Sequence, residues 1–99
     1  MLFRLTFKDD GNTRLVAAAD SRDILHWERE KSGRTAGKLS SNPAMEDFYS
    51  LAHCAARRAG SYSGSLREFE DAYRVVRVEE VVDDDTGEVD EGGPTQSGR

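Results

Sequence analysis

A chain of 99 residues has room for one small domain, and 36% hydrophobic beside 33% charged residues allows only a modest core. The formal net charge of −5 belongs to the C-terminal segment, since residues 83–99 hold six acidic side chains and one basic one, whereas residues 1–82 hold 13 of each sign. A domain that sums to zero lacks the clustered lysine and arginine that nucleic-acid binding requires, so we expect no nucleic-acid partner.

Cys54 is the only cysteine, so the chain cannot close an internal disulfide. The first residues contain no apolar run long enough for a signal peptide, and no stretch approaches the roughly 20 apolar residues of a membrane span. We therefore expect a soluble cytosolic protein without a membrane partner.

The N-terminal residues predict a β-hairpin over residues 2–18. Phe3, Leu5 and Phe7 alternate with polar residues, which is the pattern of a strand with one buried face. The Asp-Asp-Gly-Asn cluster that follows is typical of a tight turn, and residues 13–18 are expected to return as the second strand. A two-stranded hairpin is marginal alone, so its aromatic face must pack on another element.

A first helix is predicted over residues 21–31. Asp20 or Ser21 can cap its N-terminus by accepting hydrogen bonds from free backbone N–H groups, and a glycine shortly after its last residue ends it. Its apolar side, which we expect to be buried, consists of Ile24, Leu25 and Trp27. Residues 32–42 are polar, with Leu39 as their apolar anchor, and predict a mobile loop.

The second helix, predicted over residues 43–59, is the best-marked element. Pro43 suits a first turn behind Ser41 or Asn42 as cap, and Gly60 suits a left-handed C-cap. Its apolar residues recur at spacings of three and four and include Met45, Phe48, Tyr49, Ala52, Ala55, Ala56 and Ala59. We expect the alanine face to pack inside, against the third helix and the first strand.

A third helix is predicted over residues 65–77, because Ser65 and Glu68 form a capping-box pattern. Its expected apolar stripe consists of Phe69, Ala72, Tyr73 and Val76. Residues 83–99 have too little to bury and predict a disordered acidic tail. The fold class is therefore α+β, with an N-terminal hairpin packed on a small bundle of about three helices in a single domain over residues 1–82.

No group of residues in the sequence indicates catalysis, a cofactor or a metal ion. His26 and His53 with Cys54 are the candidate metal ligands or Cys–His pair, but His53 and Cys54 are neighbours on a helix and point about 100 degrees apart. We interpret Cys54 as a small, partly buried hydrophobe and the histidines as surface residues. The sequence thus predicts a binding protein rather than an enzyme.

The order of elements carries a resemblance to a known family. The hairpin is followed by an Ile-Leu-His-Trp-Glu helix, a polar loop and a helix that ends at Gly60. The next predicted helix adds Ser65, Leu66, Phe69 and Tyr73. The second of these helices contributes Phe48, Tyr49, Leu51, Ala52, His53, Ala55, Ala56, Arg57 and Arg58. Over roughly residues 20–80, and in its acidic tail, the chain resembles the tail assembly chaperones of long-tailed bacteriophages.

The resemblance implies a non-catalytic protein of the infected host's cytoplasm that is not part of the mature virion. Such chaperones bind the long, largely helical tape measure protein and keep it soluble until the tail tube polymerises around it. They are often made in short and long forms by a translational frameshift, and the long form also engages tail tube subunits. This chain resembles the short form, and self-association is left open.

A chaperone of this kind needs apolar surface beyond its own core. The six candidate partner-binding residues are Trp27, Leu39, Met45, Tyr49, Leu51 and Tyr62. A tryptophan such as Trp27 more often packs in the core or on the hairpin than serves as a binding hot spot. Trp27→Ala distinguishes the two roles, since a surface Trp27 predicts weaker partner binding with intact helices and a core Trp27 predicts unfolding.

The alternative function is that of a small phage regulatory or inhibitory protein that binds a host protein. Its acidic tail would then mimic the charge of nucleic acid. This alternative predicts a rigid, negatively charged surface rather than an apolar groove.

Overall fold

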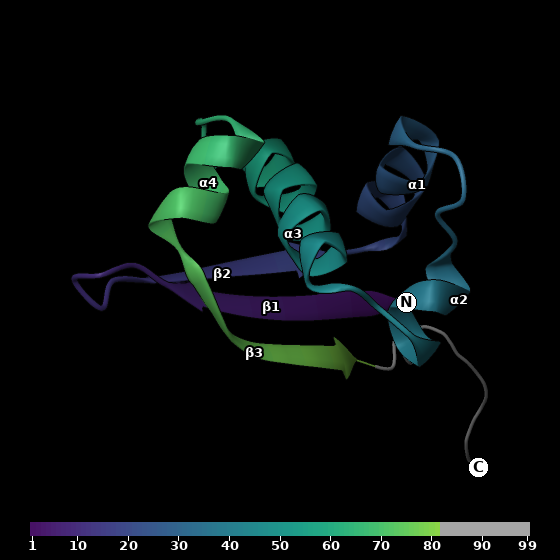
Figure 1. Ribbon diagram of the computed structural model, residues 1–99, viewed down its shortest axis with the longest axis horizontal. Helices are drawn as coiled ribbons and strands as arrows, with labels where there is room; N and C mark the ends of the chain where they lie inside the picture. The colour runs from purple at the N-terminus through teal and green to yellow at the C-terminus, as the bar shows by residue number, and fades with distance from the viewer. Residues whose placement is uncertain (82–99) are drawn as a thin grey trace, which may run out of the picture.

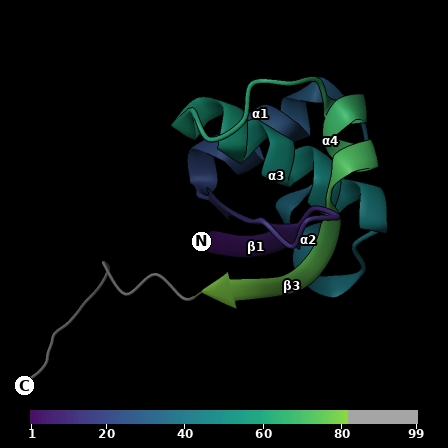
Figure 2. The same ribbon diagram turned by 90° about the vertical axis from the view of Figure 1, so that its left-hand side faces the viewer.

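The structure, a computed structural model, describes residues 1–81. The elements follow in the order β1 (Leu2–Lys8), β2 (Arg14–Ala19), α1 (Ser21–Glu30), α2 (Ala36–Ser41), α3 (Met45–Ala59), α4 (Leu66–Ala72) and β3 (Arg74–Val81). One antiparallel sheet forms a layer, and α1, α3 and α4 lie together on one side of it (Figures 1 and 2). The predicted α+β class with an N-terminal hairpin is confirmed, and the predicted acidic tail lies outside the described residues.

The hairpin forms as its turn residues predict. Asp9 Oδ1 accepts a hydrogen bond from the Thr13 backbone N–H at 2.8 Å, and Asn12 adopts a left-handed φ of 64°. Asparagine tolerates this conformation better than most residues with a side chain, because its short polar side chain can hydrogen-bond locally. The turn sets the register in which Phe3 lies opposite Ala19 and Phe7 opposite Leu15.

The third strand, β3, corrects the prediction of a helix over residues 65–77. Helix α4 ends at Ala72, and the chain then pairs with the free edge of β1, giving the strand order β2-β1-β3. Val75 lies opposite Phe7 and Val78 opposite Leu5, so both valines reach the helix-covered face. A register shift between Thr6 and Phe7 marks a bulge, which leaves Val76 exposed rather than on a helical stripe.

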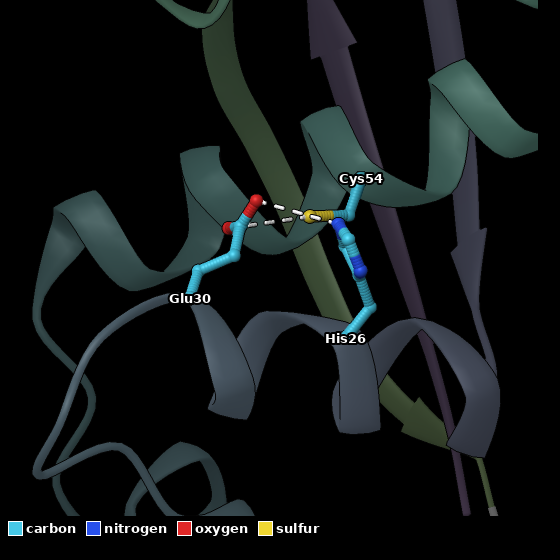
Figure 3. Close-up of side chains that lie close together, drawn as sticks. All are labelled: His26, Glu30 and Cys54. Carbon is cyan, nitrogen blue, oxygen red and sulfur yellow. Dashed lines mark hydrogen bonds and ion pairs between the residues drawn. The ribbon is translucent and has the colours of Figure 1, made fainter.

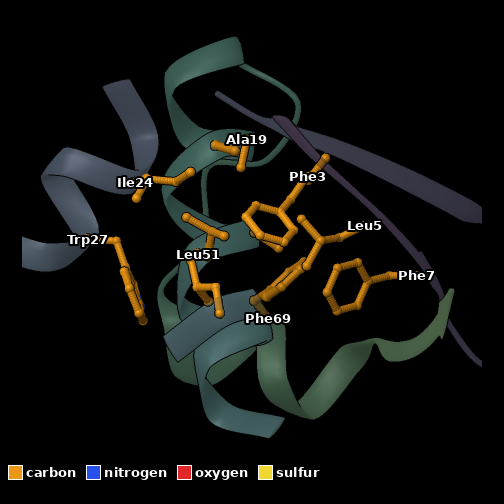
Figure 4. Packing of buried hydrophobic residues seen from close by; sticks show 12 residues of the cluster. Phe3, Leu5, Phe7, Ala19, Ile24, Trp27, Leu51 and Phe69 are labelled. Carbon is orange, nitrogen blue, oxygen red and sulfur yellow. The ribbon is translucent and has the colours of Figure 1, made fainter. Parts of the chain in front are cut away.

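The core lies between the sheet and the helices (Figure 4). Phe3, Leu5 and Phe7 point from β1 toward the helices (Figure 4). The small residues Ala52 and Ala55 of α3 are buried and let this helix approach β2 closely. Phe69 of α4 completes the core at 4.9 Å, centroid to centroid, from the Phe7 ring. The predicted alanine face is therefore inside, with Ala59 as the exception because it lies in the exposed last turn.

Three of the predicted helix caps are confirmed. Asp20 caps α1, Ser65 and Glu68 form the predicted capping box of α4, and Gly60 has a left-handed φ of 79° after α3. Helix α3 begins at Met45 rather than at Pro43, with Ala44 at the N-cap position and the Asp47 carboxylate accepting a hydrogen bond from its N–H at 2.8 Å.

Residues 32–42 are not simply a loop, because they contain α2. Thr35 caps this short helix by accepting a hydrogen bond from the Lys38 N–H. Leu39 anchors it in the core, as its isolation among polar residues predicted. Within residues 1–81, no helix combines the length and the apolar composition needed to cross a membrane.

Candidate functional site

Three of the six candidate partner-binding residues are in the core. Trp27 and Leu51 have no exposed surface and Leu39 retains 3%, so the expectation that they present a free surface is wrong. Trp27 donates its indole N–H to Ser50 Oγ at 2.9 Å, and the Arg34 guanidinium lies 4.9 Å from its ring centroid. The 3.6-residue period places Ile24 and Trp27 on one helix face, and that face turns inward.

The other three candidates remain at least partly accessible. Tyr49 and Tyr62 are half-buried and pack on the same ring, Phe69, with centroids at 5.9 and 5.2 Å. Tyr49 also donates its hydroxyl to the Tyr73 carbonyl at 2.7 Å, which ties α3 to the start of β3. Met45, at the start of α3, is 60% exposed and is the one freely exposed member of the six.

An apolar groove lies beside α1, at residues that the sequence did not single out. It has a volume of about 380 Å³ and is lined by Met1, Ser21, Arg22, Ile24, Leu25, Glu28 and Ala36. Met1 and Leu25 are 47% and 45% exposed, whereas Ile24 forms the buried floor. Leu25 was expected on the buried side of the helix, but it lies about 100 degrees from Ile24 and so cannot share the inward face.

A second, polar groove lies between α1 and α3. It has a volume of about 590 Å³ and is lined by Arg22, Asp23, His26, Glu30, His53, Cys54, Arg57 and Arg58. Buried Asp23 accepts two hydrogen bonds from Arg58, at 2.7 and 2.9 Å. Asp20 pairs with Arg22 at 2.6 Å, and this hydrogen bond, offset in part by desolvation, lowers the pKa of Asp20 to about 2.

Three potential metal ligands converge in this polar groove (Figure 3). His26 Nε2 lies 3.4 Å from Glu30 Oε2, and Cys54 Sγ lies 3.7 Å from Glu30 Oε1. Desolvation, followed by the charge of Glu30, raises the pKa of the Cys54 thiol to about 11. Without a metal, the thiol is therefore a neutral hydrogen-bond donor at neutral pH.

His53, the other histidine considered from the sequence, does not belong to this group. Its Nε2 donates to the Gly64 carbonyl at 2.8 Å, so the ring is directed toward the α3–α4 connection. The expected divergence of the neighbouring His53 and Cys54 side chains explains this separation. Sequence reasoning missed Glu30, although its spacing of four residues from His26 places both side chains on one face of α1.

The face of the sheet that is not covered by helices is predominantly basic. Arg4, Lys8, Arg14, Arg74 and Arg77 share it with the acidic Glu79, as the strand register and the alternating burial show. Glu79 pairs with Arg77 at 3.1 Å and with Arg4 at 3.8 Å. The zero net charge of residues 1–82 thus conceals a segregation of charge between the two sides of the molecule.

Comparison of the chain with protein-family models, with curated proteins and with solved structures finds no match.

Proposed function

We propose that the protein is a non-catalytic tail assembly chaperone of a long-tailed bacteriophage. It binds the tape measure protein in the host cytoplasm and keeps it soluble during tail assembly. The choice of this partner depends on the sequence resemblance over roughly residues 20–80. The structural support is more general, namely an apolar groove suited to an amphipathic helix.

The observation that carries the proposal is the joint exposure of Met1 and Leu25 along one groove. The large apolar side chains exposed in the described part of the chain are Met1, Val16, Leu25, Met45 and Val76. Two of these five, Met1 and Leu25, line a common groove. Methionine and leucine accept helices of varied sequence because their side chains adapt their shape, which suits a protein that binds a long helical partner.

The flanks of the apolar groove also suit a helix. Arg22 and Glu28 lie on its rim, one of each sign, and can pair with the polar edges of an amphipathic segment. The alternative of a host-binding inhibitor requires a negatively charged surface. Among residues 1–81 the uncovered sheet face carries five basic groups and one acidic group, so this surface does not favour the alternative.

Co-expression with the tape measure protein of the same phage tests the proposal. The wild-type chain is expected to raise the soluble yield of the tape measure protein and to co-purify with it. No change in either quantity would refute the proposed function.

Leu25→Glu tests the location of the binding site. It is expected to lower co-purification, because it places a charge in the apolar groove, while the far-ultraviolet circular dichroism stays that of the wild type. Val16→Glu is the matched control, because Val16 is 47% exposed on the uncovered sheet face. Equal loss in both variants, or in neither, would place the partner outside the groove.

A further inference from the structure

The cluster of His26, Glu30 and Cys54 has the dimensions of a metal site. Their ligand atoms lie within 4.8 Å of one another, with 3.4 Å between His26 Nε2 and Glu30 Oε2 and 3.7 Å between Cys54 Sγ and Glu30 Oε1. Zinc bonds of about 2.0–2.1 Å to nitrogen or oxygen and about 2.3 Å to sulfur, at tetrahedral angles, place two ligand atoms roughly 3.3–3.6 Å apart. Both distances lie within tenths of an ångström of this range, but they end on different oxygens of Glu30, so the carboxylate must rotate to bring one oxygen toward both His26 and Cys54.

The elements that carry these ligands favour such an adjustment. His26 and Glu30 are one turn apart on α1, and their side chains are 67% and 45% exposed, so they can move without disturbing the core. Cys54 is half-buried on α3, which packs directly against α1. The less mobile thiol thus faces two adaptable ligands across a helix pair.

Three arginines, Arg22, Arg57 and Arg58, line the polar groove, and carboxylates neutralise two of them. Arg22 pairs with Asp20, and Arg58 pairs with both Asp20 and Asp23. Arg34 lies 3.5 Å from Glu30 Oε1, so it competes with a metal for one carboxylate oxygen but leaves Oε2 on the His26 side. A thiolate and a carboxylate together balance the charge of a divalent ion.

We propose that His26, Glu30 and Cys54 bind a divalent transition metal of the zinc class. Imidazole and thiolate ligands select zinc, cobalt and related ions over magnesium or calcium, which prefer oxygen ligands alone. The three protein ligands leave a fourth position for water or for a side chain of a bound partner. The bound ion joins α1 to α3 beside the proposed partner groove, and its binding is independent of the proposed function.

Titration of the full-length, chelator-treated and reduced protein with Co²⁺ tests the site. Because Cys54 is the only cysteine, a sulfur-to-cobalt charge-transfer band reports on that residue alone. The wild type is expected to show this band together with the visible absorption of tetrahedral cobalt, and Zn²⁺ is expected to displace both. Cys54→Ser is expected to lose the charge-transfer band.

Substitution of the two exposed ligands tests whether all three residues bind the metal. His26→Gln and Glu30→Gln are each expected to weaken cobalt binding at least tenfold. His53→Gln is the matched control, because glutamine can still donate toward Gly64 and His53 lies outside the ligand set. Circular dichroism checks that every variant is folded. Absence of the charge-transfer band in the wild type would overturn the proposed site. Unchanged cobalt affinity in either His26→Gln or Glu30→Gln would also overturn it, because the thiol would then bind cobalt without all three proposed ligands.

Discussion

The hydrogen bond between Trp27 and Ser50 offers a direct test of the core. Both residues are buried, and Ser50 Oγ accepts the indole N–H at 2.9 Å while donating to the Glu46 carbonyl at 2.8 Å. Ser50→Ala leaves the indole N–H in the core without this partner. An unsatisfied buried donor costs about 1–3 kcal/mol of unfolding free energy, and the better helix propensity of alanine offsets about 0.5 kcal/mol.

A double-mutant cycle isolates this interaction. Trp27→Phe removes the donor and reduces the ring volume, whereas Trp27→Ala also opens a large cavity at a cost of about 3–5 kcal/mol. Once phenylalanine replaces Trp27, Ser50→Ala no longer leaves a donor unpaired. The double variant Trp27→Phe/Ser50→Ala is therefore expected to be about 1 kcal/mol more stable than the sum of the single effects implies.

Urea unfolding followed by far-ultraviolet circular dichroism measures all four proteins of the cycle. Trp27 is the only tryptophan, so its fluorescence in the wild type is an independent probe, with buried-indole emission that shifts to longer wavelength on unfolding. Two results together would refute the placement of Trp27 in the core. Ser50→Ala would be as stable as the wild type, and the folded wild type would already show the emission of an exposed indole. Wild-type stability of Trp27→Ala would do the same.

Three further predictions concern caps and buried charge. Gly60→Ala is expected to cost about 1 kcal/mol because φ is +79° there, whereas Gly37→Ala, in the open first turn of α2, is expected to cost nothing; equal urea midpoints of the two variants would contradict this. Because its pKa falls from 3.8 to about 2 on folding, Asp20 contributes stability that is complete above about pH 4 and lost as the pH falls toward 2; Asp20→Asn keeps a capping oxygen and should flatten that part of the stability–pH curve, and an unchanged curve would exclude Asp20 as its source. Arg58→Met leaves buried Asp23 without its bidentate partner and is expected to lose about 3 kcal/mol, part of which Asp23→Asn should restore in the double variant; thermal unfolding of both proteins checks this, with no recovery as the contrary result.

The functional residues were harder to predict than the fold. The spacing of apolar residues along a predicted helix identifies which of them share a face, but it does not show whether that face packs against the core. Trp27 and Leu51 therefore qualified as candidate binding residues and were found inside. Leu25 was expected inside and was found at the surface, because α3 and the sheet cover only one side of α1.

The sequence by itself determined the elements whose causes are local. Alternating apolar residues define β1, Asn12 and its neighbours define the turn, and Ser65 with Glu68 and Gly60 mark helix ends, since caps and turns depend on residues a few positions apart. Tertiary structure decided whatever needed a distant partner. Residues 74–81 became a strand because the free edge of β1 accepts one, and Cys54 meets Glu30 only because α3 packs on α1. Contacts of this kind depend on how whole elements pack, which the pattern within a single segment does not determine.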